Sequence, residues 1–461
     1  MKHQRFRFSL EVTILEDATG VVINHPAKQR GHLLRVLGFG FGLAVIIGNT
    51  IGSGVFRTQG QIASNLPNVW WFLAVWVVGG LYALLGAVQI AELGTLLPRS
   101  GGQYVFVRHA LGEYAGFLVG WSDWISTCGS AAAVGIVIGE FSAALLPSLR
   151  PHQTLLSAIV ISLFAVLQWR GIVVGSGVQN VTSLIKALAF VALIIAAFAL
   201  GRGIASDSTV PMPSGLGLVA AFVLSLQAVI FTYDGWSGAV YFSEEVKDPG
   251  KDIPRSLFGG VFLIIAIYLF VNLALLYVLP VSEIAGKEFA IGAAAQVMFG
   301  RHGDTIFLSL TILSMLSAIN AYHLMATRVL FAMSRDGLFT RSAATVNAGG
   351  TPEVALLFSA IVAVLFIAFG QTFEKVITVL AFFFVANYAL SFLSVFVLRR
   401  REPERARPYR AWGYPWTTAL ALVGSVLFLA GAVYIDRRNS VYALLLLAVS
   451  YPIFRLVKRL A

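Results

Sequence analysis

The chain has 461 residues, of which 58% are apolar and 12% are charged. Its mean hydropathy is +0.81, whereas about a quarter of the residues in soluble domains are charged. This small number of charged residues cannot cover a water-facing surface. Most of the exterior is therefore expected to face lipid. The net charge of +11 does not indicate a nucleic-acid partner, because the basic residues follow the pattern of membrane loops described below.

Apolar stretches long enough to cross a bilayer, roughly 17 to 25 residues each, recur along the whole chain. They lie near 36–60, 70–97, 114–146, 154–173, 180–201, 214–243, 257–280, 303–332, 354–370, 376–398, 415–434 and 440–456. The sequence therefore predicts an all-α membrane protein of about twelve transmembrane helices.

The distribution of Lys and Arg predicts the orientation. Most of them fall in the two tails and in the even-numbered loops, and the densest group lies in residues 399–410. Cytoplasmic loops carry such an excess, so both termini and this loop are expected in the cytoplasm. The first 34 residues have no short apolar core followed by a small-residue cleavage site, so no cleavable signal peptide is expected.

Two spans are interrupted at their centres by glycine-containing segments. The first contains residues 48–54 in IIGNTIGSGVF, and the sixth contains residues 233–238 in FTYDGWSG. Paired interruptions in corresponding positions of two halves indicate helices that unwind at the midplane around a substrate. Glycines can also serve only close helix packing, but Asn49, Thr50 and Ser53 lie among the glycines of the first break and favour unwinding.

Unwound helices offer donors and acceptors to a ligand that carries both an anionic and a cationic group, such as an amino acid. The half-helix beginning near Gly52, Ser53 and Gly54 would present backbone N–H groups and a positive dipole end to a carboxylate. Carbonyl groups freed around Phe231 and Thr232 would accept hydrogen bonds from an ammonium group. Nearby aromatic side chains, Phe231 and Trp236, would supply apolar walls or a gate.

Lys186 is the basic residue deepest inside an uninterrupted span. A lysine at the centre of a membrane helix costs roughly 2.5 to 3.5 kcal/mol on insertion scales, so it is read first as functional. The alternative is that its long side chain reaches an interface.

Three more polar residues lie inside predicted spans. Asp234, in the second break, would compensate an ammonium group or exchange a proton with it, or it would cap the following half-helix. Asp123 and Asn320 are auxiliary candidates.

No pattern for an enzyme or a cofactor site is found. The chain has one cysteine, Cys128, so neither an internal disulfide nor a cysteine metal cluster is expected. No nucleophile motif, phosphate-binding loop or cofactor fingerprint occurs in the required context. We therefore expect no enzyme activity, no metal and no cofactor.

Several motifs resemble the amino acid, polyamine and organocation transporter superfamily, and within it the L-type amino acid transporter branch and its bacterial relatives. They are TIGSGVF in the first span, AELGTLLPRSGGQYVFVRHALG after the second, FTYDGWSGAVYFSEEVKDPGKDIPRS through the sixth, SAINAYHLMATRVLFAMSRDG in the eighth and LRRREPERARPY after the tenth. The resemblance covers spans 1 to 10.

The resemblance implies a five-plus-five inverted repeat with broken helices 1 and 6. The units would be a cytoplasmic tail at 1–34, repeats at 35–202 and 214–400, and two further helices at 412–457. The substrate would be bound by Thr50, Ile51, Gly52, Ser53, Gly54, Phe231, Thr232, Asp234 and Trp236. Lys186 matches the lysine that stands in place of a sodium ion in sodium-independent members.

The implied function is secondary active transport of amino acids by alternating access. Transport is expected to need no sodium and to proceed by exchange or proton coupling. Neutral substrates are expected, because the segment 124–129 lacks an acid that would pair with a cationic side chain. The alternatives are transport of cationic amino acids or amines, or a non-transporting amino-acid sensor. The expected partners are the substrate and lipid, without a disulfide-linked subunit, and the oligomeric state is open.

Overall fold

The structure of the chain is a computed structural model that describes residues 32–201, 203, 211–369, 373–435 and 437–460. Helices make up nearly all the regular structure of these ranges. The predicted all-α membrane fold class is therefore confirmed. The expected cytoplasmic tail at 1–34 lies almost entirely outside the described residues.

Up to residue 201 the described chain forms five long helices, the first of them broken into α1 and α2, and two short elements. They are α1 (Phe39–Thr50), α2 (Gly54–Asn65), α3 (Val69–Leu96), α4 (Gln103–Leu111), α5 (Glu113–Leu145), η1 (Pro147–His152), α6 (Gln153–Trp169) and α7 (Ile172–Leu200). Glycines with positive φ separate consecutive helices, namely Gly112 at +97° and Gly171 at +132°. Both turns need a backbone conformation that other residues rarely adopt.

The remaining elements begin after residue 215. They are α8 (Leu216–Tyr233), η2 (Gly238–Phe242), α9 (Pro249–Val278), α10 (Val281–Ile284), α11 (Ala290–Phe299), η3 (Gly300–His302), α12 (Gly303–Arg335), η4 (Arg341–Ala344), α13 (Glu353–Phe369), α14 (Phe373–Arg401), α15 (Trp416–Ile435) and α16 (Arg437–Leu460). Helix α9 begins well before the predicted residue 257. Its charged first turns are helical because Pro249 occupies the first position, where its missing N–H is not needed.

Among the described residues, ten helices are long and apolar enough to cross a membrane, or eleven if α1 and α2 are counted as one bent span. Helix α13 is a shorter apolar helix of 17 residues. Each predicted span has a helix at its position, but the total of twelve membrane crossings stays a prediction.

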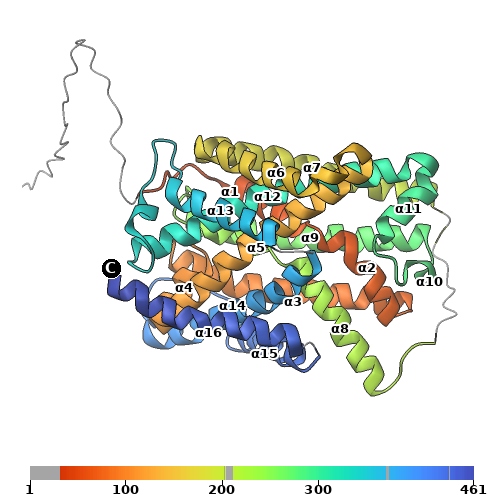
Figure 1. Ribbon diagram of the computed structural model, residues 1–461. Coiled ribbons are helices and arrows are strands. Elements are labelled where there is room, and N and C mark those ends of the chain that lie inside the picture. Colours follow the sequence, from red (N-terminus) through yellow and green to blue (C-terminus); the bar gives the residue numbers. More distant parts are fainter. Residues whose placement is uncertain (1–31, 202, 204–210, 370–372, 436, 461) are drawn as a thin grey trace, which may run out of the picture.

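The long helices run side by side in one bundle, with α4 at one end and α10 and α11 at the other (Figure 1). The most extensive helix contact joins α5 to α12 near the centre. Helices α15 and α16 lie at the edge of the bundle, where they contact α14, α3 and α5. The broken helices therefore lie within the bundle and the last two helices at its periphery.

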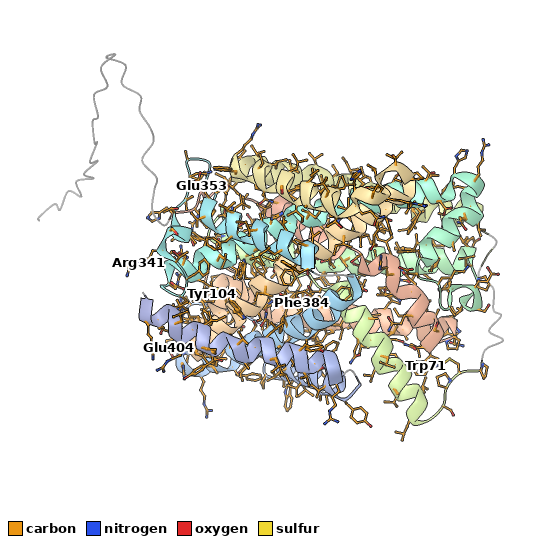
Figure 2. The ribbon with its side chains drawn as sticks, in the orientation of Figure 1. Trp71, Tyr104, Arg341, Glu353, Phe384 and Glu404 are labelled. Atoms are coloured by element: carbon orange, nitrogen blue, oxygen red, sulfur yellow. The ribbon has the colours of Figure 1, made fainter. Side chains whose placement is uncertain are left out.

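The charged residues Arg341, Glu353 and Glu404 lie at the end of the bundle that carries α4 and the C-terminus, whereas Phe384 lies near the middle (Figure 2). Arg328 of α12 makes two hydrogen bonds to Glu245, of 3.0 and 2.9 Å, and both side chains are buried. Asp336, just after α12, accepts hydrogen bonds from Arg99 and Tyr104 at 2.9 and 3.0 Å. These pairs join α12 to the segments that follow α3 and η2.

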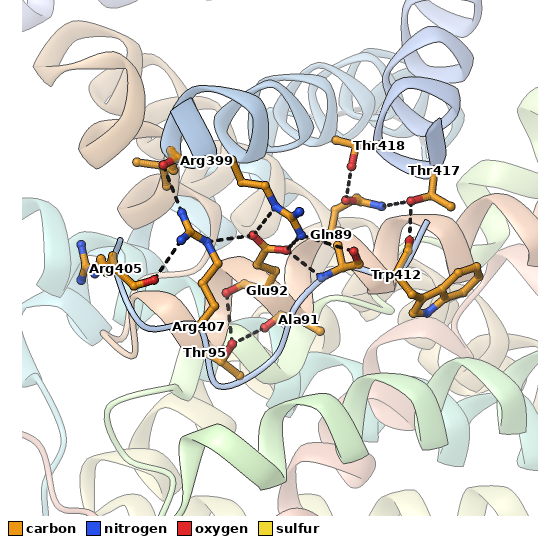
Figure 3. Close-up of polar contacts among 12 residues, drawn as sticks. Gln89, Ala91, Glu92, Thr95, Arg399, Arg405, Arg407, Trp412, Thr417 and Thr418 are labelled. Atoms are coloured by element: carbon orange, nitrogen blue, oxygen red, sulfur yellow. Dashed lines mark hydrogen bonds and ion pairs between the residues drawn. The ribbon is translucent and has the colours of Figure 1, made fainter. Parts of the chain in front are cut away.

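A second cluster at this end is centred on Glu92 of α3 (Figure 3). Its carboxylate accepts a hydrogen bond from Arg399 Nε at 2.9 Å and pairs with Arg407 Nε at 3.2 Å. One turn away, Gln89 accepts a hydrogen bond from Thr418 of α15 at 2.7 Å. Because one buried carboxylate serves two arginines, the arginine-rich segment between α14 and α15 is held against α3.

Candidate functional site

The first predicted helix break is present between α1 and α2. Helix α1 ends at Thr50, α2 begins at Gly54, and the two are bent by 48°. In the part of the chain that the structure describes, the Ser53 side chain makes no capping hydrogen bond to α2. The first backbone N–H groups of a helix have no partner within it, so the start of α2 offers donors and a positive dipole end.

The second break follows α8, which ends at Tyr233. Asp234 is extended with a ψ of 145°, and Gly235 has a φ of +106°. The chain then continues as the short 3₁₀ helix η2 from Gly238. The turn depends on Gly235, because a side chain there would be strained and would also collide with Asn49 and the backbone of Thr50.

The two breaks face each other at very short range. The Asn49 side chain lies 3.4 Å from the Gly235 carbonyl oxygen and donates a hydrogen bond to it. A Cβ atom placed on Gly54 would lie 2.9 Å from Thr232 Oγ1 and 3.0 Å from Thr232 Cα. Real Cβ contacts are rarely so short, so the approach of α2 to α8 requires glycine at position 54.

Lys186 of α7 points into the protein and does not extend to an interface. Its side chain is 1% exposed, and its Nζ donates hydrogen bonds to the carbonyl oxygens of Gly48 and Ile51 at 2.9 and 2.8 Å. The Ile51 carbonyl also accepts from Ser314 of α12 at 3.1 Å. Lys186 therefore supplies two of the hydrogen bonds that the end of α1 lacks.

A cavity lies where the two breaks meet α5, α12 and α14. Its free volume is about 20 Å³, and its lining consists of Asn49, Thr50, Gly52, Ser53, Gly54, Ser130, Val134, Phe231, Thr232, Asp234, Tyr322 and Phe384. A space of this size has room for about one water molecule and is far smaller than an amino acid. The structure therefore represents a closed arrangement, in which a ligand could enter only after the helices around the breaks move apart.

Asp234 is one of the residues that line this cavity. Tyr388 of α14 donates a hydrogen bond of 2.6 Å to Asp234 Oδ1, and Trp236 stacks on the Tyr388 ring with centroids 4.9 Å apart. Asp234 thus links the second break to α14 and is also available to the cavity. The Asp234 side chain also accepts a hydrogen bond from the backbone of Gly235, so both sequence interpretations of Asp234, substrate contact and capping, stay predictions.

Most of the predicted substrate-binding residues lie together in the structure. Those in the cavity lining are Thr50, Gly52, Ser53, Gly54, Phe231, Thr232 and Asp234. Ile51 is buried, and its carbonyl oxygen accepts a hydrogen bond from Lys186. Trp236 is also buried, against Tyr388 and beside Gly86. Neither is part of the lining.

The two auxiliary candidates lie outside the cavity lining. The carboxylate of Asp123 of α5 accepts a hydrogen bond from the hydroxyl of Tyr241, whose oxygen lies 2.8 and 2.9 Å from the two carboxylate oxygens. Asn320 of α12 donates to Gln179 at 2.8 Å and accepts from Gln168 at 3.0 Å. Asn320 therefore joins α12 to α6 and α7.

Other lining residues have no distinct signal in the sequence. Ser130 and Val134 come from α5, Tyr322 from α12 and Phe384 from α14. Each lies within an uninterrupted helix among other apolar or small residues, so only the packing of these helices against the breaks reveals it.

The bundle of apolar helices and the two facing breaks define a polytopic membrane protein with a buried polar site. The chain matches the amino acid permease family over residues 39–454. It is 30% identical to the serine/threonine exchanger SteT of Bacillus subtilis (strain 168). The 433 aligned residues cover 93% of this chain and 98% of SteT.

Two mammalian proteins are similar over slightly shorter lengths. The human b(0,+)-type amino acid transporter 1 is 26% identical over 86% of this chain and 82% of its own length. The mouse Asc-type amino acid transporter 1 is 28% identical over 83% of this chain and 74% of its own length. The chain therefore belongs to the amino acid permease family, and it is a secondary amino acid transporter rather than an enzyme.

The close approach of the two breaks gives a first prediction. Gly54→Ala should reduce transport at least tenfold, because the added methyl group separates α2 from Thr232. The matched control is Gly40→Ala in α1, where a Cβ atom would meet nothing within 4 Å. Initial rates of amino acid uptake, normalised to folded protein, provide the measurement. Equal rates for the two variants would contradict the tight contact.

Proposed function

We propose that this chain carries small neutral amino acids by alternating access, without sodium, in exchange for internal substrate or together with a proton. The observation that carries the proposal is the cavity between the start of α2 and the end of α8. The N–H groups at Ser53 and Gly54 would hold the carboxylate. The N–H of Gly52, which donates to the Thr50 carbonyl at 2.8 Å, would join them once that contact opens. Carbonyl groups near Phe231 and Thr232 would hold the ammonium group.

Independence from sodium is supported by the position of Lys186. Its ammonium group contacts two carbonyl oxygens at the break of α1, and carbonyl oxygens are typical ligands of hard cations. A cation bound at the same oxygens would be repelled by the lysine at very short range. A fixed lysine would thus supply the positive charge that an ion would otherwise bring.

Selection of neutral substrates is supported by the rest of the lining. Ser130, Val134, Tyr322 and Phe384 surround the space that the substrate side chain would enter, and none of them carries a charge at neutral pH. A cationic amino acid or amine is the second candidate, because Asp234 brings a carboxylate to the same cavity. The hydrogen bond from Tyr388 to its Oδ1 gives this carboxylate a partner within the protein.

The organisation of the chain is part of the same proposal. The repeats would span 35–202 and 214–400, and the helices within 412–457 would lie outside them, as the peripheral position of α15 and α16 supports. The arginine-rich end of the bundle would face the cytoplasm, in a bacterial inner membrane. No disulfide-linked subunit is required by this scheme, and it leaves the oligomeric state open.

The experiment is uptake of labelled serine, alanine, leucine and lysine into proteoliposomes that contain the purified protein. We expect uptake of at least one small neutral amino acid, stimulated by the same amino acid inside or by an inward proton gradient, and unchanged when sodium is replaced by choline. Uptake of lysine alone would favour the second candidate. Absence of transport for every amino acid, or an absolute need for sodium, would contradict the proposal.

A further prediction concerns Lys186. Lys186→Ala should reduce transport at least tenfold while much of the protein still folds, because the Gly48 and Ile51 carbonyls lose a donor at the site itself. Thr182→Ala on the same helix is the control, since its hydroxyl bonds back to Val178 within α7. Uptake and monodisperse yield should be compared for both variants. Equal fractional losses of uptake and yield in Lys186→Ala would indicate a purely structural role.

A further inference from the structure

A groove runs along the outside of the bundle between α6 and α13, apart from the candidate site. Its free volume is about 590 Å³, and its lining is aliphatic except for Ser162, Trp169 and Glu353. The small side chains of Ala165 and Ala360 are part of that lining, which leaves space between two helices that pack against each other and against α5. The groove therefore belongs to the part of the surface that faces the membrane.

One end of the groove is polar. Trp169 is the last residue of α6 and Glu353 the first of α13, and the Trp169 indole donates a hydrogen bond of 2.7 Å to Glu353 Oε1. The next residue of the chain, Arg170, is exposed. Glu353 lies at the end of the bundle that carries α4 (Figure 2). Tryptophan and arginine at the end of a membrane helix are typical of the level of the lipid headgroups, so the groove begins at the membrane surface.

The groove is about as deep as one leaflet of a membrane. Twelve residue steps along α13 separate Glu353 from Leu365, the last residue of the lining, and at 1.5 Å per residue they span about 18 Å. Half of a hydrocarbon core of about 30 Å is about 15 Å. Along this length the Ser162 hydroxyl already bonds to the Ala158 carbonyl at 2.8 Å. Below its polar end the groove thus offers an apolar surface.

These dimensions favour an extended hydrocarbon chain as the occupant. The volume divided by the length gives a mean cross-section of about 33 Å², whereas an α-helix about 10 Å in diameter needs about 80 Å². A membrane helix of another protein is therefore too wide for the groove. Water does not stay in an apolar space of this kind, and the surrounding leaflet supplies acyl chains at this depth.

We propose that this groove binds one phospholipid with an ethanolamine headgroup, whose acyl chain lies between α6 and α13. Such a headgroup carries a phosphate and an ammonium group. The Arg170 guanidinium pairs with the phosphate. The Glu353 carboxylate, which can accept several hydrogen bonds besides that from Trp169, receives the ammonium group. An anionic headgroup without an ammonium group meets the negative charge of Glu353 and binds less tightly.

The test counts phospholipid molecules bound to the purified protein by native mass spectrometry. Delipidated protein in detergent is titrated with dioleoyl phosphatidylethanolamine or with dioleoyl phosphatidylglycerol. Ala165→Trp fills the groove, whereas Ala192→Trp, the matched control, places the same side chain at an exposed position of α7 outside the lining. We expect one saturable phosphatidylethanolamine adduct on the wild type and on Ala192→Trp, and at least fivefold less of it on Ala165→Trp.

Two variants at the polar end test the headgroup contacts. Arg170→Ala should lower the phosphatidylethanolamine adduct at least threefold, because the phosphate loses its partner. Glu353→Gln keeps an acceptor for the Trp169 indole but removes the charge. It should therefore reduce the preference for phosphatidylethanolamine over phosphatidylglycerol at least threefold.

Equal adducts on Ala165→Trp and Ala192→Trp would overturn the proposed site, and so would equal binding of the two lipids to the wild type. A protein dimer that is lost in Ala165→Trp alone would assign the groove to a second copy of the chain and would also overturn it. Should Ala165→Trp not fold, Leu365→Trp at the deep end of the same groove takes its place, with the same fivefold loss expected.

Discussion

Backbone groups that leave a helix in the middle of a membrane must find partners inside the protein, because lipid offers none. The breaks at the end of α1 and the end of α8 create such groups. Three neighbouring helices supply hydrogen bonds to them, through Lys186 of α7, Tyr268 of α9 and Ser314 of α12. The position of the candidate site and the packing of the bundle around it both follow from this requirement.

Contacts between the segments around the two breaks account for the closed form of the site. The cavity has about 20 Å³ of free volume, and direct contacts between the breaks, such as Asn49 with Gly235, keep it small. At the far end from α4, Arg57 of α2 pairs with Glu140 of α5 at 3.4 Å and with Glu288 at 3.5 Å. Admission of a substrate would separate α2 from α8 and replace some of these contacts by contacts to the ligand.

Much of this architecture is predictable from the sequence, because its signals are local. Apolar length predicts the spans, and glycines clustered with polar residues predict both breaks. A lysine inside a span is read first as functional, and Lys186 does contact the end of α1. The contributions of Tyr268, Tyr322 and Phe384 are not predictable in this way, since each lies in an uninterrupted apolar helix and acquires its role only from the packing of that helix against a break.

The central claim is that the two breaks bind the carboxylate and the ammonium group of one amino acid together. Thermal stabilisation of the purified protein by serine should be compared with that by ethanolamine, which lacks the carboxylate, and by 3-hydroxypropionate, which lacks the amino group. The account predicts a clear rise in melting temperature with serine and none with either analogue at the same concentration. Stabilisation by either analogue equal to that by serine would contradict it.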